Sequence, residues 1–429
     1  MTYAQPKKIF NSVVSNKVRS GLVAALDLGT TKACCLIAKP KADGGFEIIG
    51  IGHQISHGLR SGKIIDMERT ESTIRSTIEA AEKMAGENIR NVVVNVSCGD
   101  PMSSLIAYEV SIAGHEICDN DLRRLLDPAG LVERENTERE LIHLIPVGYS
   151  VDGNKGVRDP RGLYGNSLGV NMHIVTAASG PLRNLEQGIS RCHLNICSKA
   201  ITPYASALAC VSQDEANLGV TCIDMGGGTT TISVFFDGEL VYIDSIPVGG
   251  VHVTNDIARG LSTPFVHAER MKTLYGSAIP TPSDNNEIIK VPLIGEEETG
   301  ETNQVPRSVL IGIIRPRMEE TFELVRNRLA DTGFDKVAGR RIVLTGGASQ
   351  LSGAKEMAGE ILDKQVRQGR PHRVDGLAES VSGPAFSTSV GLLHFVFNNP
   401  AKEANNAYRP SDEPNSSFAR FGQWLKESF

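Results

Sequence analysis

The feature that most constrains this sequence is an approximate internal repeat, in which an apolar, strand-like run ends at an aspartate and a glycine-containing turn follows. In the first copy, AALDLGTTKACCLIA, the apolar run ends at Asp27, and in the second, TCIDMGGGTTTISVF, it ends at Asp224. The turn residues are Gly29, Thr30 and Thr31 in the first copy and Gly226, Gly227, Gly228 and Thr229 in the second. The two aspartates lie 197 residues apart, which leaves room for a whole domain between them.

Each copy has the residue types that bind phosphate and hydrated magnesium. A glycine-rich turn exposes backbone N–H groups that can wrap phosphate oxygens, and neighbouring hydroxyls add donors. An aspartate at a strand end can hold Mg²⁺ through water, because magnesium keeps much of its hydration shell. A single Asp-x-Gly is more simply a turn. Two copies in register favour a clamp that holds a nucleoside triphosphate from both sides.

A third glycine turn, TGGA, follows the apolar run IVL and opens a helix. Alone it is a weak signal, but here it suits a close approach of the backbone to a base or ribose. The segment HAERMKTLYG places Glu269 and Lys272 three residues apart, on one helix face. Two interpretations remain open for this pair: a surface ion pair, or contacts to ribose and adenine.

Charge and cysteine usage exclude several classes of protein. The chain has 44 Lys and Arg against 50 Asp and Glu, a net charge of −6, whereas nucleic-acid-binding domains are usually basic. Its eight cysteines are scattered without a CxxC pair, and its first residues lack a signal-peptide core, so we expect buried thiols in a reducing cytosol. Since no uncharged apolar run approaches 18 residues, we expect no membrane span. A cytoplasmic, multidomain, mixed α/β protein remains.

The pattern between the repeats predicts several elements. A helix begins after Asp66 as its cap and stops at Gly86, and a buried strand occupies 92–97. The run CSKAITPYASALACV, residues 197–211, predicts a helix of small residues. Another long helix is predicted from Pro316 to about residue 330. Residues 98–180 change character and indicate a small α/β module inserted into the first domain.

The last part of the chain predicts a second activity. Residues 398–417 contain no apolar run and are typical of a disordered linker. At 100° per residue, five apolar side chains of the following segment fall on one arc: Phe418, Phe421, Trp424, Leu425 and Phe429. Arg420 and Lys426 accompany them, which suits an interfacial membrane anchor. The alternative is a tail helix that docks onto its own domain, and the linker argues against it.

The order of these pieces resembles a known superfamily. A phosphate hairpin, a connecting helix, a second hairpin, an adenosine turn and a second connecting helix (GPAFSTSVGLLHF) resemble actin, the sugar kinases and the heat-shock chaperones. Within it, about residues 20–429 closely resemble the bacterial FtsA cell-division family. Three segments carry that resemblance: LIHLIPVGYSVDG…GVRDPRGLYGNSLGVNMHIVTA, VLTGGASQLSG and SFARFGQWLKESF. The long leader and the polar loop 276–306 depart from it.

The resemblance implies an α/β, actin-like, two-domain nucleotide-binding fold with an FtsA-type inserted subdomain and a C-terminal amphipathic helix. The implied division is a flexible leader at 1–20, subdomain 1A at 21–97 and 181–218, the inserted subdomain 1C at 98–180, subdomain 2A at 219–256 and 335–397, subdomain 2B at 257–334, a linker at 398–417 and a membrane-targeting helix at 418–429.

The resemblance also implies ATP and Mg²⁺ as ligands, with roles carried over by motif. Phosphates would be bound by Gly29, Thr30, Thr31 and Lys32 from one side and by Gly226, Gly227, Gly228, Thr229 and Thr230 from the other. Asp27 and Asp224 would position Mg²⁺ and its water, as the candidate catalytic residues. The adenosine would contact Gly346, Gly347 and Ala348, with Glu269 and Lys272 opposite.

The implied hydrolytic activity is weak. Superfamily members that hydrolyse ATP well place an acid or an amide on the first connecting helix, where it orients the attacking water. ITPYASALA offers only Thr202 and Ser206 there, and a hydroxyl is a poor general base at neutral pH. We therefore expect weak or no ATPase activity, with the nucleotide acting as a ligand for conformation and polymerisation.

The implied function is an ATP-binding division protein that polymerises on the inner face of the cytoplasmic membrane at the septum. It would bind membrane lipids through its C-terminal helix and so anchor the FtsZ ring there. It would also bind itself and recruit later division proteins, with no nucleic-acid partner. FtsZ's short, partly acidic tail would bind near Arg315 and Arg317, placed at a helix start, unless these arginines pair with Glu319, Glu320 and Glu323. A pilus- or plasmid-type actin homologue is the alternative, and a sugar-kinase-like enzyme is a weaker one.

Overall fold

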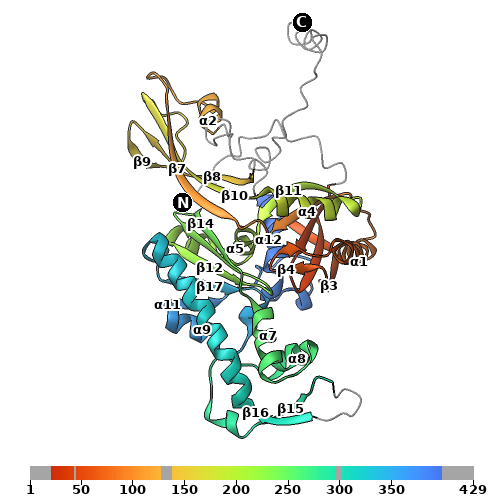
Figure 1. Ribbon diagram of the computed structural model, residues 1–429. Coiled ribbons are helices and arrows are strands. Elements are labelled where there is room, and N and C mark those ends of the chain that lie inside the picture. Colours follow the sequence, from red (N-terminus) through yellow and green to blue (C-terminus); the bar gives the residue numbers. More distant parts are fainter. Residues whose placement is uncertain (1–20, 43–44, 127–137, 296–301, 399–429) are drawn as a thin grey trace.

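The computed structural model of the chain describes residues 21–42, 45–126, 138–295 and 302–398 (Figure 1). Two β-sheets lie beside each other in the middle of the molecule, an inserted module stands above them, and a smaller extension lies below. We call the two central units lobe 1 and lobe 2. In the described part of the chain, no helix is both long and apolar enough to cross a membrane.

The two lobes are built on sheets of the same strand order. The sheet of lobe 1 runs β11-β6-β1-β2-β3, and that of lobe 2 runs β18-β17-β12-β13-β14. The bounds in lobe 1 are β1 (Val23–Leu28), β2 (Lys32–Pro40), β3 (Phe46–Ile55), β6 (Asn91–Val96) and β11 (Asn195–Ile201). Those in lobe 2 are β12 (Val220–Met225), β13 (Thr230–Phe236), β14 (Glu239–Ile246), β17 (Arg341–Thr345) and β18 (Gln365–Gln368).

The sequence repeat is a structural repeat, down to the strand register. Asp27 pairs with Cys34 across the β1–β2 hairpin, and Asp224 pairs with Thr231 at the equivalent place in β12–β13. Each turn closes with the same backbone hydrogen bond, from Gly29 N to the carbonyl of Lys32 (3.0 Å) and from Gly226 N to the carbonyl of Thr229 (2.9 Å). The prediction of two equivalent hairpins is confirmed.

Helices cover the sheets and connect the lobes. Helix α1 (Met67–Ala85) has Asp66 as its N-cap and the left-handed Gly86 at its C-terminal end, as predicted. Helices α4 (Ser179–Arg191) and α12 (Ser387–Asn398) pack on lobe 1, and α5 (Thr202–Cys210) lies between α12 and the lobe 2 strands β12 and β13. Helices α5 and α12 cross at Gly391, where a Cβ atom would overlap the carbonyl of Ala205. The lobes therefore meet on a tight helix crossing.

Two helix predictions are wrong at their starts. Residues 197–201 lie in β11, because this run pairs with β6 as a parallel strand, so α5 begins only at Thr202. The long helix α9 (Arg307–Thr332) begins nine residues before Pro316, which lies inside it. The preceding residues Leu310, Ile311 and Ile314 are buried in lobe 2 contacts, and this packing outweighs the helix-breaking tendency of proline. Arg315 and Arg317 therefore lie within a helix.

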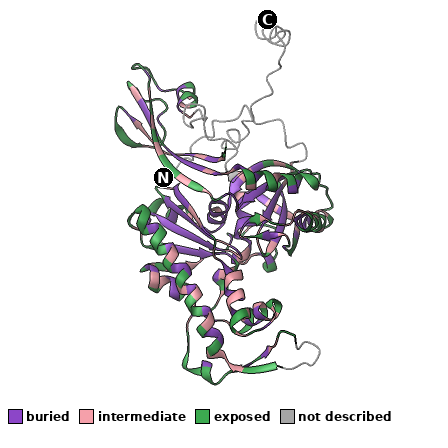
Figure 2. Ribbon diagram, in the orientation of Figure 1, coloured by how far each residue is buried: buried purple, intermediate pink, exposed green. Residues whose placement is uncertain are grey.

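The inserted module has its own sheet and core. Strands β7 (Met102–Ser111), β10 (Ser167–Ala178), β8 (Arg139–Val151) and β9 (Asn154–Val157) lie in that order, with α2 (Asp119–Leu125) against them. A separate cluster of buried apolar side chains that includes Leu125 and Leu168 fills the space between them. Figure 2 shows this purple core thinning to an exposed tip. We call this module the insert.

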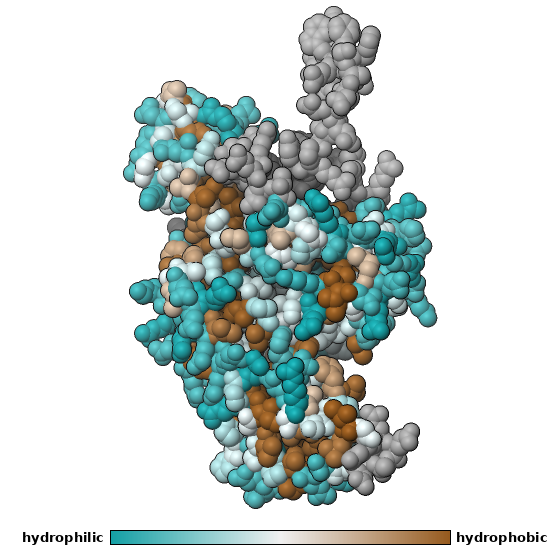
Figure 3. Space-filling view, in the orientation of Figure 1, coloured by the Kyte–Doolittle hydropathy of each residue, from teal (hydrophilic) through white to brown (hydrophobic). Residues whose placement is uncertain are grey.

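The lower extension hangs from lobe 2. It contains α7 (Gly250–Gly260), α8 (Phe265–Tyr275), the hairpin of β15 (Ile288–Pro292) and β16 (Thr302–Pro306), and the start of α9. Apolar side chains gather on its visible face (Figure 3). Among the described residues of this extension, Val266, Leu274 and Ile294 are more than half exposed. The remaining elements are β4 (Leu59–Arg60), β5 (Lys63–Ile64), α6 (Gln213–Leu218), η1 (Pro282–Asn285), α10 (Phe334–Val337), η2 (Gly347–Gln350), α11 (Ala354–Leu362), η3 (Glu379–Val381) and η4 (Pro384–Phe386).

Candidate functional site

A cavity of about 130 Å³ lies where β1, β6, β12 and β17 end, between the two lobes. This is the expected position for a ligand in an open α/β sheet, just beyond the carboxyl ends of the parallel strands. The residues that line it are Asp27, Gly29, Thr30, Thr31, Lys32, Gly62, Asn95, Ser97, Thr202, Asp224, Gly226, Gly227, Gly228, Thr229, Thr231, Gly346, Gly347, Pro384, Ala385 and Thr388.

The two hairpins face each other across this cavity at very close range. A Cβ atom on Gly227 would meet the side chain of Thr31, and one on Gly228 would meet Thr30 and the backbone of Ser61. Neither glycine has an unusual positive φ, so it is the lack of a side chain that these positions require. The glycines thus let backbone from one lobe approach hydroxyls from the other.

The two aspartates lie buried on opposite sides of the cavity and share one helix as hydrogen-bond donor. Ser389 Oγ donates to Asp27 Oδ2 (2.9 Å), and Thr388 Oγ1 donates to Asp224 Oδ2 (3.3 Å). Burial raises the pKa of Asp27 to about 6, although Lys32 and Ser389 act to lower it. Burial raises the pKa of Asp224 as well. Two buried carboxylates near one lysine form a site that a cation would stabilise.

Lys32 is turned toward the segment that precedes α12. Its ammonium group donates a hydrogen bond to the carbonyl of Ala385 and lies 3.2 Å from the centre of the Phe386 ring. Burial lowers the pKa of this lysine, and the charge of Asp27 opposes that effect. Because Lys32 also lines the cavity, its charge is available to an anionic ligand that enters there.

Asn95 organises a polar network on the floor of the cavity. Its side-chain oxygen accepts a hydrogen bond from Leu28 N (2.7 Å), and its amide nitrogen donates to Ser97 Oγ (3.0 Å) and Thr202 Oγ1 (3.3 Å). Thr202 Oγ1 in turn donates to the carbonyl of Val96 (3.1 Å). All polar atoms of this amide are engaged with protein. Asn95 therefore holds the first hairpin in place and is not free to orient a water molecule.

One buried hydroxyl in the cavity lacks a protein partner. Thr231 Oγ1 is buried, lines the cavity, and makes no hydrogen bond within the described residues. An unpartnered buried polar atom is costly, so this hydroxyl indicates that a polar ligand group belongs beside it. Together with the two carboxylates, whose oxygens are the ligands that Mg²⁺ prefers, it shows that the residues present fit a hydrated cation and phosphate oxygens.

Most of the sequence-predicted cleft residues come together here, and four do not line the cavity. Thr230 Oγ1 donates instead to the carbonyl of Val248 (2.8 Å). Lys272 Nζ donates to Glu269 Oε2 (2.7 Å) and to the carbonyl of Gly250 (3.0 Å). The four are Thr230, Glu269, Lys272 and Ala348. The glycine turn and α8 nevertheless meet, because a Cβ on Gly250 would touch both Ala348 and Lys272.

Seven lining residues were not predicted from the sequence: Gly62, Asn95, Ser97, Thr231, Pro384, Ala385 and Thr388. Two signals could have found some of them. Asn95 and Ser97 interrupt and follow an otherwise apolar strand, and Thr231 continues the threonine run of the second hairpin. Gly62 and the 384–388 segment approach the cavity only through tertiary packing.

The predicted membrane and partner residues stand apart from the cavity. The tail residues Phe418, Phe421, Trp424, Leu425 and Phe429 lie outside the described residues. Arg315 Nε pairs with Glu319 (2.7 Å), one turn along α9. Arg317 Nε pairs with Asp256 of α7 (2.6 Å) and also bonds Glu320. Both arginines are thus engaged with acids of this chain, as the alternative interpretation expected.

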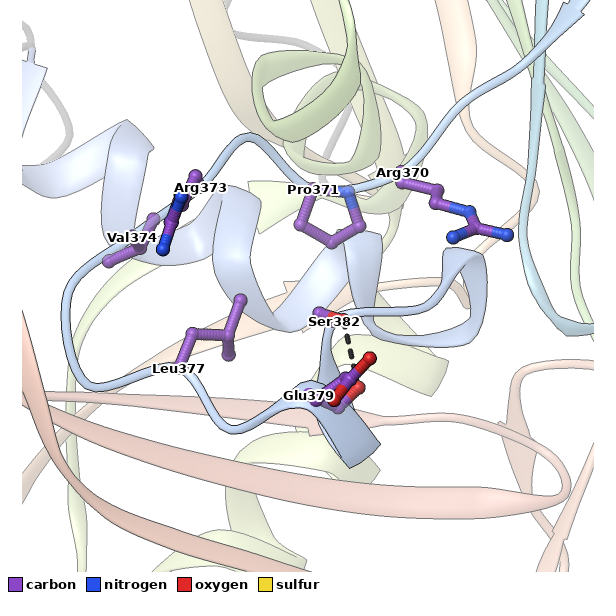
Figure 4. A pocket seen from close by; sticks show the side chains of 7 residues that line it. All are labelled: Arg370, Pro371, Arg373, Val374, Leu377, Glu379 and Ser382. Carbon is purple, nitrogen blue, oxygen red and sulfur yellow. Dashed lines mark hydrogen bonds between the residues drawn. The ribbon is translucent and has the colours of Figure 1, made fainter.

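A second cavity, of about 420 Å³, lies within the loop that joins β18 to η4 (Figure 4). Pro371 and Leu377 point toward its centre from opposite sides, with Arg370 and Arg373 at its ends. Its lining contains no residue of the glycine turns or of the aspartate motifs. This cavity is therefore separate from the candidate site.

Two lobes with the same sheet order, each contributing an aspartate and a glycine turn to one cleft, place this chain in the actin-like class of α/β proteins. Solved structures agree on the fold. The PilM chain of a "PilM-PilN type IV pilus biogenesis complex" matches with a TM-score of 0.61 at 16% identity. The match covers 86% of this chain and 97% of that one. MreB 5 of Spiroplasma citri bound to AMPPNP matches with a TM-score of 0.54 at 13% identity, covering 90% and 99%.

Sequence comparison identifies the family within that class. The profile of the family described as cell division protein FtsA matches residues 221–391, and that of the SHS2 domain inserted in FtsA matches residues 101–176. Proteins named cell division protein FtsA are 46% identical in Rhizobium meliloti (96% of both chains), 35% in Pseudomonas aeruginosa (96% of this chain, 99% of that one) and 31% in Escherichia coli K12 (95% and 98%). The chain belongs to the FtsA family of cell-division proteins.

Proposed function

We propose that this chain binds ATP with Mg²⁺ in the cleft between its lobes and uses the nucleotide to control its conformation and self-assembly. The single observation that carries the proposal is that the two Asp-Gly hairpins have the same strand register and the same turn hydrogen bond and face each other across the cavity. Phosphates would be cradled by the turns 29–32 and 226–229. The adenosine would lie toward Gly346 and Gly347, with Glu269 and Lys272 on the far side of Gly250.

Magnesium, when bound, would neutralise phosphate charge and orient water, held through its hydration shell by Asp27 and Asp224. The residues that line the cavity then determine the rate of ATP hydrolysis, which we expect to be low. Among the described lining residues the only carboxylates are those two aspartates, and the only side-chain amide is Asn95, which is fully engaged. Thr202 and Ser97 offer hydroxyls, which are poor bases at neutral pH. We expect slow turnover and a long-lived ATP-bound state.

The nucleotide site is tested by two substitutions. Asp224→Ala removes one cation ligand, and Gly227→Asp places a side chain against Thr31 across the cleft. Each should abolish measurable binding of a fluorescent ATP analogue in the presence of Mg²⁺. Gly312→Ala is the matched control, because nothing lies within 4 Å of the added methyl group. Unchanged affinity in both cleft variants would overturn the site.

We further propose that the chain acts at the inner face of the cytoplasmic membrane, anchored by the amphipathic pattern of residues 418–429. Burying an aromatic side chain contributes about 1.5–3 kcal/mol, so charges on that face should prevent insertion. Phe421→Glu with Trp424→Glu should release the full chain from anionic liposomes without changing its thermal midpoint. Gln423→Glu with Glu427→Gln, on the opposite face, is the control. Retained sedimentation of the double variant would place membrane binding elsewhere.

The proposed partner is the acidic C-terminal tail of FtsZ, bound on the lower extension, with self-assembly and recruitment of later division proteins following from membrane attachment. Arg315 and Arg317 remain the proposed contacts, although each now has to exchange an internal acid for a peptide carboxylate. Arg315→Glu with Arg317→Glu should weaken a synthetic tail peptide at least tenfold, about 1.4 kcal/mol, with ATP affinity intact. Unchanged peptide affinity in a folded variant would show that the tail peptide does not bind at this helix.

A further inference from the structure

The insert is hydrogen-bonded to the edge of lobe 2 through one side chain. Ser103, on β7, accepts a hydrogen bond at Oγ from the backbone N–H of Ile243 on β14 (3.3 Å). The same oxygen lies 2.6 Å from Nε2 of His173 on β10. The three groups form a relay in which Ile243 donates to Ser103 and the Ser103 hydroxyl donates to His173. We call this relay the seam.

The seam is partly buried, with His173 and Ile243 inside the protein and Ser103 partly exposed. His173 is fully buried, and burial lowers its pKa to about 4, so the imidazole is neutral at physiological pH and one ring nitrogen can accept a hydrogen bond from the Ser103 hydroxyl. The backbone of Leu240, also on β14, acts on the same ring and opposes the lowering of its pKa. Val147 of β8 packs against the core of lobe 2 beside it. Breaking the seam would leave buried polar groups unsatisfied.

The other side of the insert is fixed to lobe 1. His143, on β8, accepts at Nε2 a hydrogen bond from the backbone N–H of Ile201 (2.9 Å). Ile201 directly precedes Thr202, which begins α5 and lines the cleft. Lys199 of β11 also pairs with Glu140 of β8 (3.3 Å). Figure 1 shows the insert standing over both lobes, with the lower ends of its strands next to β14 and β11.

The cleft is too small for a nucleotide as it stands. Its volume of about 130 Å³ is well below the roughly 300–1,000 Å³ of typical ligand pockets. We therefore expect a ligand of nucleotide size to change the separation of the lobes when it binds. A module that is hydrogen-bonded to both lobes must then either tilt with one of them or break its bonds to the other.

We propose that the insert is a lever that converts lobe separation into its own tilt, through the Ser103 seam to lobe 2 and the His143 bond to lobe 1. This inference rests on the proposed nucleotide binding. A partner that holds the insert in one tilt would change ATP affinity by the same factor as ATP changes the partner's affinity, because coupling between two binding sites is reciprocal. The insert thus acts as the nucleotide-sensitive surface of the molecule.

The test follows two distances in the full chain. Fluorophores introduced with noncanonical amino acids at exposed positions 83 (α1) and 355 (α11) report lobe separation, and a pair at 83 and 155 (β9) reports insert tilt. In the labelled protein with an intact seam, Mg-ATP should shift both energy-transfer signals. Ser103→Ala should keep the lobe shift and lose at least half of the insert shift. Ser104→Ala, the same change at the next, exposed residue, should behave as the unsubstituted protein.

A second variant removes the donor. Ile243 N–H points away from β13, since it donates to Ser103, so proline there removes no hydrogen bond of the sheet. Because the Ile243 side chain is buried, the thermal midpoint of this variant is measured as well, and only a folded variant is compared. Ile243→Pro should reproduce the effect of Ser103→Ala. An insert shift that persists in both seam variants while the lobe shift is present overturns the lever. Fluorescent-ATP binding is measured on the same samples. Absent binding in the protein with an intact seam overturns the proposed function, whereas normal binding with a lobe shift but no insert shift in that same protein overturns the lever alone.

Discussion

Ser389 donates a hydrogen bond to Asp27 across 362 residues of sequence, with 2.9 Å between Ser389 Oγ and Asp27 Oδ2. The contact joins the first turn of α12 to the end of β1, and Thr388, its neighbour, reaches Asp224 in lobe 2. One helix turn therefore positions both carboxylates. The cleft depends on this turn as much as on the two hairpins that the sequence makes conspicuous.

Removing this hydroxyl should weaken nucleotide binding. Ser389→Ala takes away a hydrogen bond to a charged group, a contribution of about 1.5–3 kcal/mol, and allows burial to raise the pKa of Asp27 further above its value of about 6. We expect Mg-ATP affinity at pH 7 to fall several-fold and to recover in part at pH 8. Ser382→Ala is the control, since its hydroxyl bonds only the backbone of Glu379. Equal titration curves for the two variants would contradict this role.

The crossing of α5 and α12 should tolerate no side chain. Gly391→Ala would force its methyl group into the carbonyl of Ala205, whereas Gly312→Ala in α9 meets nothing within 4 Å. We expect the first to lower the free energy of unfolding by at least about 2 kcal/mol, as overpacked cores do, and the second to raise it by about 0.5–1 kcal/mol. Urea denaturation of both variants measures the contrast. Equal stabilities would mean that the helices slide apart without cost.

A partly buried ion pair joins α6 to β18, the edge strand of the lobe 2 sheet. Arg367 of β18 bonds both carboxylate oxygens of Glu215 in α6, at 2.6 Å each, and lowers the pKa of Glu215 to about 2. Arg367→Met should cost about 1.5–3 kcal/mol, because it removes hydrogen bonds to a charged group, while Glu215 keeps its longer pair with Arg341 (3.4 Å). The pair stabilises the fold above pH 4.5, and that contribution is lost as the pH falls toward 2. Arg367→Met with Glu215→Gln should recover part of the loss in urea denaturation.

His173 of the seam should also make stability depend on pH. Here the cause is burial of a neutral imidazole, whereas for Glu215 it is pairing of a charged carboxylate. Because burial lowers the pKa of His173 from 6.5 to about 4, the unfolded chain binds the proton more readily. Stability should therefore fall as the pH drops from 6.5 to 4, by at most about 1.4 kcal/mol per pH unit for this residue. His394, with the same shift, adds its own share. His173→Gln should flatten the dependence measured by denaturation at pH 7 and 5, and an unaltered slope would show that His173 is not buried neutral.

The parts of the fold that the sequence predicted are those that depend on local chemistry. The hairpin turns, the cap at Asp66 and the stop at Gly86 follow from glycine and side-chain hydrogen bonding within a few residues, and the structure confirms them. The errors came where packing decides. Residues 197–201 form a strand only because β6 lies beside them, and Pro316 is carried inside α9 by the buried residues before it.

The candidate site divides in the same way. Asp27, Asp224 and the glycine turns were found because each motif is contiguous in the chain. Three other residues, Thr388, Ser389 and Asn95, contact the aspartates or the first hairpin only in the folded protein. They could not be predicted from spacing in the sequence. The pairing of Arg317 with Asp256 also joins two helices and could be named from the sequence only as one of several possible pairs.

The large sequence separation between Ser389 and Asp27 also determines when the site can form during synthesis. During synthesis Asp27 is made early, and its hydroxyl partner is added only after 362 further residues. A growing chain on the ribosome therefore carries both hairpins well before it has the helix turn that positions their carboxylates. The cleft is completed in one late step, so a product that stops before α12 contains every glycine motif and still lacks an assembled site. Only a chain that extends through α12 can assemble the proposed nucleotide site.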